Sequence, residues 1–95
     1  MTTLRIENTV TDFDRWKAAF DAYADVRTRM GAHRWRVTRQ LDDQLHVWVD
    51  LDFHSTGDAQ AFADFLVNKV WTTPRSQTVL AAHHMPVLLE LIESR

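Results

Sequence analysis

Apolar and polar residues alternate without interruption from Gln44 to His54. The apolar row is Leu45, Val47, Val49, Leu51 and Phe53, and the opposite row is His46, Trp48, Asp50, Asp52 and His54. Successive side chains of a strand point to opposite faces of a sheet. The segment therefore predicts a sheet with one face packed against helices and the other meeting water or a polar partner.

Three more segments have the alternation of strands. Thr3 to Val10 forms a first strand with Asn8 in its apolar row, and Ala32 to Leu41 forms a second with one mostly apolar face. Asp42-Asp43 predicts the turn that joins this second strand to the next in a hairpin. The last predicted strand is Met85 to Glu93.

Between these strands the apolar spacing changes to three and four residues, which is typical of helices with one buried side. The first predicted helix begins after a cap at Thr11 or Asp12 and ends at Gly31. Its predicted buried stripe is Phe13, Trp16, Phe20, Tyr23, Val26 and Met30.

Two further helices are predicted after the hairpin. One begins at a Ser55 or Thr56 cap and closes at Trp71. A shorter one starts at Thr73-Pro74, a cap followed by a proline in the first turn, and runs to about His83 before Pro86 prevents its continuation.

The chain has 95 residues, of which 45% are hydrophobic and 25% charged, and this predicts a single domain over residues 1–95. The absence of cysteine excludes disulfides, thiolate nucleophiles and cysteine metal sites. A net charge of −2 gives no general attraction to phosphate backbones, so a nucleic-acid partner is not expected.

The remaining composition argues against membrane and metal sites. Met1 to Thr11 has neither a basic stretch nor a continuous apolar run, and no segment approaches the roughly 20 apolar residues that span a bilayer. We therefore expect a cytoplasmic protein without a membrane partner. The five histidines do not form a cluster at ligand spacing, so no metal site is expected.

The order strand, helix, strand, strand, helix, short helix, strand predicts the α+β class. It is the βαββαβ pattern of a ferredoxin-like fold, with a four-stranded antiparallel sheet and the helices on one face.

Four segments carry a family resemblance. They are the run from Val10 to Lys17, the Asp42-Asp43 hairpin, the helix start from Ser55 to Ala59, and the segment from Trp71 to Met85. In these the chain resembles the small dimeric α+β barrel proteins, and among them the antibiotic-biosynthesis-monooxygenase-like group. The resemblance spans the whole chain and implies a homodimer in which two sheets pack face to face.

The second face of the sheet bears on that assembly. Its expected residues are Arg5, Glu7, Arg34, Arg36, Trp48, Asp50, Asp52 and Glu90, with Leu88 and Ile92. Such a face is either solvated or covered by a second copy. The apolar side chains favour the second copy, with Arg34 or Arg36 of one chain meeting Asp50 or Asp52 of the other.

Asn8 is the odd residue of the first strand, an amide in an apolar row. A buried amide needs hydrogen-bond partners, which either the protein or a ligand supplies. In the resembling monooxygenases, and in the related haem-degrading enzymes, an asparagine on the first strand reaches the bound substrate or haem. Asn8 matches that position.

Other candidate residues lie in the helical half of the chain and in the strands beneath it. His83 and His84 fall near the expected end of the short helix, and one of them is expected to face inward. The aromatic residues are first of all core, but they would also line a flat pocket for a ring-containing ligand. The predicted ligand-binding set is Trp35, Phe53, Trp71, Tyr23 and His84.

The resemblance implies either a cofactor-free monooxygenase or a polyketide-type cyclase acting on a hydrophobic or aromatic small molecule. His83 would remove a proton, and Asn8 would donate to the resulting oxyanion. Two alternatives remain open: a non-catalytic binding protein, and a haem-degrading monooxygenase. The haem enzymes carry a tryptophan just after the third strand, where this chain has Phe53.

Overall fold

The computed structural model describes all 95 residues, Met1 to Arg95. In chain order its elements are β1 (Thr2–Val10), α1 (Phe13–Ala22), α2 (Ala24–Arg29), β2 (Ala32–Gln40), β3 (Asp43–Phe53), α3 (Thr56–Phe65), the π-helix η1 (Leu66–Val70), α4 (Pro74–Val79), β4 (Leu80–His83) and β5 (Val87–Glu90).

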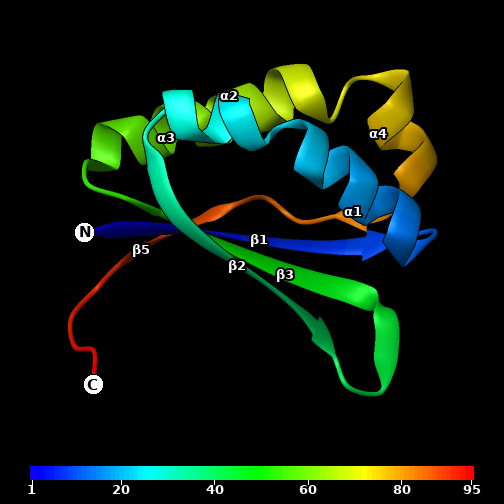
Figure 1. Cartoon of the computed structure of the whole chain (residues 1–95), viewed down its shortest axis with the longest axis horizontal. Helices are drawn as coiled ribbons and strands as arrows, with labels where there is room; N and C mark the ends of the chain where they lie inside the picture. Colours follow the sequence, from blue (N-terminus) through cyan, green and yellow to red (C-terminus); the bar gives the residue numbers. More distant parts are fainter.

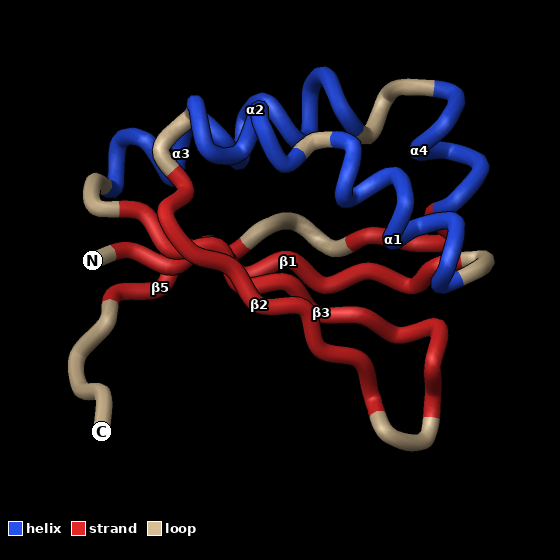
Figure 2. Tube along the Cα trace, viewed as in Figure 1, coloured by secondary structure: helices blue, strands red, loops and turns tan.

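The strands form one antiparallel sheet with the order β2-β3-β1, and β4 and β5 both pair with β1. All the helices lie on one side of this sheet, while the β2–β3 hairpin and the C-terminal tail extend away from them (Figures 1 and 2). The predicted α+β class and ferredoxin-like arrangement are confirmed, but the sheet has five strands and not the four predicted, because the last part of the chain forms two short strands.

The strand alternation places the core as the sequence predicts. Seven side chains on the helix-facing side of β1 and β3 are at most 5% exposed: Leu4, Ile6, Val10, Val47, Val49, Leu51 and Phe53. Burying an apolar side chain of this size stabilises a fold by about 1.5–3 kcal/mol. The sheet and the helices are therefore held together chiefly by this row and its helical partners.

The predicted helix boundaries are confirmed where a local signal sets them. Asp12, Ser55 and Thr73 each cap a helix, since the side-chain oxygen of each accepts a hydrogen bond from the backbone N–H three residues later. Gly31, which ends the first helical stretch, has φ of 107°, a conformation that L side chains rarely adopt.

The helices are less regular than predicted. The first one is interrupted at Tyr23, whose N–H donates to the carbonyl oxygen of Phe20 and separates α1 from α2. The next widens into a π-turn at its end, where the N–H of Trp71 donates to the carbonyl oxygen of Leu66, five residues earlier, at 2.9 Å.

The prediction for the last third of the chain is wrong in two places. The short helix ends at Val79 and not near His83, because residues 80–83 extend and pair with β1 as β4. The predicted strand from Met85 to Glu93 is limited to β5. Pro86, which has no N–H to donate, lies between these two short strands.

This change also corrects the face assigned to the last strand. Leu88 pairs with the buried Leu4, and directly opposite residues of a strand pair share a face, so Leu88 points toward the helices. By the same register Val87, opposite Arg5, lies on the outer face of the sheet.

Candidate functional site

A cavity of about 70 Å³ lies between the helices and the sheet, and we call it the helix–sheet cavity. Of its 16 lining residues, 13 are hydrophobic. The other three are Asn8, Arg27 and Ser76. Ligand pockets commonly combine apolar walls with a few polar groups that orient the ligand, although most are larger, at about 300–1,000 Å³.

Asn8 reaches the cavity from β1 and is only 3% exposed. Its side chain makes no hydrogen bond within the protein, and its Oδ1 atom is completely buried. An unsatisfied buried polar atom costs about 1–3 kcal/mol. The sequence identified this position correctly as an amide within an apolar row, and the structure provides no internal partner for it.

Trp71 reaches the cavity by way of the π-turn. The turn places Leu66, Val70 and Trp71 on its wall, and all three are buried. Single π-turns within helices occur frequently at functional sites. Trp71 was predicted correctly to end a helical segment, but no local sequence pattern predicts the widened turn.

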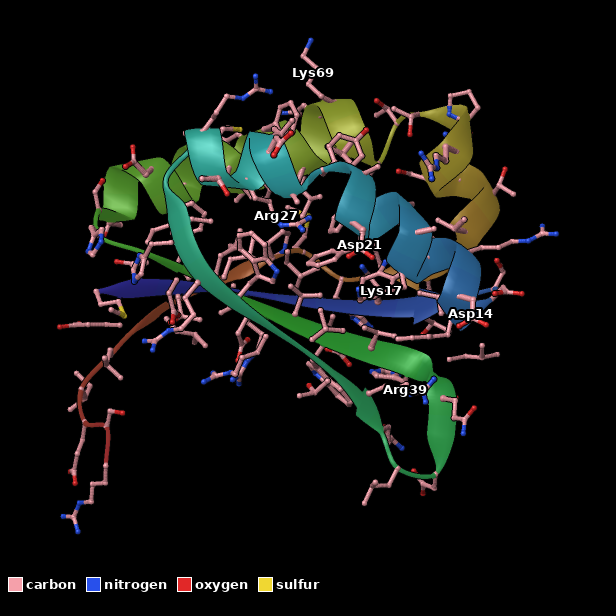
Figure 3. All side chains as sticks on the ribbon, in the orientation of Figure 1. Asp14, Lys17, Asp21, Arg27, Arg39 and Lys69 are labelled. Atoms are coloured by element: carbon pink, nitrogen blue, oxygen red, sulfur yellow. The ribbon has the colours of Figure 1, made fainter.

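Arg27 is the charged residue of the cavity wall that was not predicted from the sequence. It lies on α2, is 3% exposed, and projects between the helix layer and the sheet (Figure 3). Burial lowers the pKa of its guanidinium to about 10, against a smaller opposing effect of the Asp21 charge. The sequence does contain a signal for its burial. Arg27 follows Phe20 by seven residues and Tyr23 by four, a spacing that places it on the same buried side of a helix.

The two adjacent histidines point in different directions. His83 is the direct partner of Asn8 across β1 and β4, and its ring stacks on Trp71 with 4.1 Å between ring centres. His83 does not line the cavity itself, but it contacts one of its walls. His84 lies on the other face, where its Nε2 is 3.9 Å from the Glu7 carboxylate.

The remaining predicted ligand-binding aromatics separate into two kinds. Tyr23 lines the cavity directly. Trp35 and Phe53 do not: Trp35 lies against the guanidinium of Arg27, and Phe53 is fully buried in the core. The structure therefore brings together Asn8, Tyr23 and Trp71 around the cavity, with Trp35 and His83 behind it.

On the outer face of the sheet the charges pair within the chain. Asp50 accepts hydrogen bonds from Arg5 at 2.9 Å and from Arg36 at 3.1 Å. Asp52 accepts one from Arg34 at 3.1 Å. These pairs form within one chain, and the expected pairs between two copies remain a prediction.

These ion pairs also lower the pKa values of the Asp50 and Asp52 carboxyl groups. The hydrogen bond from Arg5 lowers the pKa of Asp50, burial opposes it, and Arg36 adds to the lowering. Burial raises the pKa of Asp52, but hydrogen bonds from Thr3 and Arg34 outweigh it, so the pKa is lowered overall.

The outer face carries apolar side chains as well. Trp48 lies on it beside His46, with 4.4 Å between ring centres. Further along, Val87, Leu91 and Ile92 are 53%, 47% and 83% exposed. This side of the sheet has no helix over it (Figure 1).

No group of three or more histidine, cysteine, aspartate or glutamate side chains is placed to hold a metal ion. None of the helices has the length and apolar character needed to cross a membrane.

Solved structures share this architecture along the whole chain. SnoaB of Streptomyces nogalater, a cofactor-independent oxygenase, has a TM-score of 0.74 at 15% identity, covering 98% of this chain and 94% of that one. The chain shares the fold of this protein. A putative antibiotic biosynthesis monooxygenase of Nitrosomonas europaea has a TM-score of 0.66 at 15% identity, covering 98% of this chain and 100% of that one.

A third solved structure shares the same fold. A dimeric ferredoxin-like protein from an uncultured marine organism has a TM-score of 0.62 at 8% identity, covering 100% of this chain and 98% of that one. No protein-family model matches the sequence, and no curated protein matches it significantly. The likeness is therefore one of fold, and the chemistry must be argued from the site.

Proposed function

We propose that the protein binds a hydrophobic or aromatic small molecule in the helix–sheet cavity and oxidises it as a cofactor-free monooxygenase. The observation that carries this proposal is the buried Asn8 amide without a protein partner, in a cavity with otherwise mostly apolar walls. The fold shared with a cofactor-independent oxygenase supports it. A polyketide-type cyclase would use the same cavity and the same residues.

In the proposed reaction the substrate extends from the cavity past Trp71 to His83, which takes a proton from its activated CH₂ group, and Asn8 donates a hydrogen bond to the enolate oxygen. Molecular oxygen adds to the resulting carbanion to give a peroxide, to which His83 returns the proton, and loss of water then leaves a carbonyl group. The overall balance is CH₂ plus O₂ giving C=O plus H₂O. Trp71 and Trp35 would help to position the rings.

One observation favours a second candidate, a non-catalytic binding protein. Tyr23 and Arg27 are the only titratable residues that line the cavity, and His83 stands behind Trp71. Oxygen uptake with anthrone, a three-ring ketone with an activated CH₂ group, separates the two candidates. Protein-dependent uptake of one O₂ per anthrone supports the oxygenase, whereas binding without uptake supports the binding protein.

We propose further that the protein is a homodimer whose two sheets pack through their outer faces. The exposed Val87, Leu91 and Ile92 support this, as do the half-buried Trp48 on the same face and structural neighbours described as dimeric. Native mass spectrometry tests it: the expected mass is twice the 11.1 kDa of the chain. A species of 11.1 kDa alone at working concentration would contradict it.

A further inference from the structure

Arg27 is a buried cation without an anionic partner. The arginines of the outer face, Arg5, Arg34 and Arg36, all form ion pairs with aspartates, yet each has a side chain at least 49% exposed. Arg27 is 3% exposed and forms no ion pair. Removing an unpaired ion from water costs several kcal/mol, so its position requires compensation.

The protein supplies part of that compensation. Nη1 of Arg27 donates to the carbonyl oxygen of Phe20 at 2.6 Å. The guanidinium carbon lies 3.7 Å from the centre of the Phe20 ring and 4.5 Å from that of Trp35. Aromatic faces attract cations, and the attraction is stronger where water is excluded.

One edge of the guanidinium has no partner. The Nε–H of Arg27 is buried without an acceptor. The one hydrogen bond of the guanidinium is made by Nη1, so Nη2 has none. These two donors lie side by side on the planar group, while the occupied Nη1 lies on the other side. A parallel pair of N–H donors is the arrangement that binds both oxygens of a carboxylate.

The surroundings of this edge fit an aromatic or apolar acid. Arg27 lines the helix–sheet cavity from α2, and Asn8, the other residue with an unpartnered buried atom, lines it from β1. Trp16, Phe62 and Trp71 supply apolar walls. The cavity thus has one fixed positive charge and no negative one among its lining residues.

We propose that the ligand of the helix–sheet cavity carries a carboxylate, which binds the Nε–Nη2 edge of Arg27 while its apolar part lies against the aromatic walls. The inference rests on the proposed function, since it names the class of molecule that the same cavity takes. With a pKa of about 10, Arg27 remains charged at neutral pH, where carboxylates are ionised.

The direct test compares benzoate with benzamide, its neutral analogue of nearly equal size, by isothermal titration calorimetry at neutral pH. The unaltered protein should bind benzoate at least about tenfold more tightly, because its carboxylate can accept two charge-assisted hydrogen bonds from Arg27 and the neutral amide cannot. This comparison needs no variant and does not depend on how Arg27 contributes to folding.

Variants then assign the preference to one residue. Arg27→Met should bring benzoate affinity down to that of benzamide, and Arg27→Lys, which keeps the charge but not the paired edge, should retain only part of the preference. Arg39→Met is the matched control, because Arg39 also lies over an aromatic ring, 4.4 Å from that of Phe13, but outside the cavity. It should leave the benzoate preference unchanged.

The outcomes separate this inference from the proposed function. Equal binding of benzoate and benzamide would overturn the carboxylate while leaving the aromatic-binding site in place. Binding of neither probe would overturn both. A benzoate preference that persists in folded Arg27→Met, with its folding checked by circular dichroism, would also overturn the assignment to Arg27.

Discussion

Asn8 and His83 are direct partners across β1 and β4, so a buried amide and an imidazole occupy neighbouring positions on the helix-facing side of the sheet. The pairing exists because residues 80–83 form a strand and not the end of a helix. Since the ring of His83 stacks on Trp71, the imidazole is held against a wall of the cavity. This relationship makes the roles of the two residues separately testable.

His83→Ala should lower the rate of anthrone oxidation at least about 100-fold, because a positioned general base contributes about that much or more. Binding of anthrone should persist, since Asn8 and the cavity walls remain. The rate is measured with an oxygen electrode and binding by tryptophan fluorescence. His84→Ala is the control, because His84 lies on the other face of the sheet, and equal losses in both variants would count against His83 as the base.

Asn8→Leu should increase the free energy of unfolding by about 1 kcal/mol while abolishing ligand binding. Leucine is similar in size and removes a buried polar atom that has no partner. Urea denaturation measures the stability change. Asn8→Ala, which also removes the amide but leaves a void, should not gain stability. A marked loss of stability in Asn8→Leu would indicate that the amide is needed for folding.

The strands and most of the helix starts could be predicted because their signals are local. The β3 alternation fixes which face is buried, and capping residues such as Ser55 act within three residues. The segment Leu80–His83 could not be predicted in this way. Its residues are compatible with a helix, and it extends because it pairs with β1, about 70 residues earlier in the chain.

The candidate site was predictable in part for the same reason. Asn8 can be recognised from its local sequence alone, because it is an amide in the apolar row of the first strand. The place of Arg27 depends on the interruption at Tyr23, which decides which residues of the following turn are buried. An arginine near an apolar stripe is usually interpreted as a flanking charge, so its burial becomes evident only once the helices are packed.

Trp48→Glu should dissociate the proposed dimer or prevent its folding, because it places a charge on the outer face of the sheet. Light scattering of the purified variant gives its mass. Lys69→Glu is the control, since Lys69 projects from η1 into solvent on the far side of the helices (Figure 3). An unchanged dimer mass for Trp48→Glu would mean that Trp48 lies outside the interface.

The Asp50 cluster should make stability depend on pH in the acid range. In the folded protein the pKa of the Asp50 carboxyl group is below the ordinary value of an aspartate, chiefly because of the hydrogen bond from Arg5. Such a group stabilises the fold fully above its unfolded pKa, and the stabilisation is lost as pH falls through the folded pKa.

Asp50→Asn should therefore lower stability at neutral pH by less than about 1 kcal/mol, since Arg5 and Arg36 are largely exposed and screened by water. It should also flatten the fall in stability between about pH 5 and pH 2, because the amide does not titrate. Urea midpoints across this range measure both effects. Asp25→Asn, at an exposed carboxyl outside any ion pair, should leave the curve unchanged. Identical pH profiles for Asp50→Asn and the unaltered protein would mean that the Arg5–Asp50–Arg36 cluster does not contribute to folding.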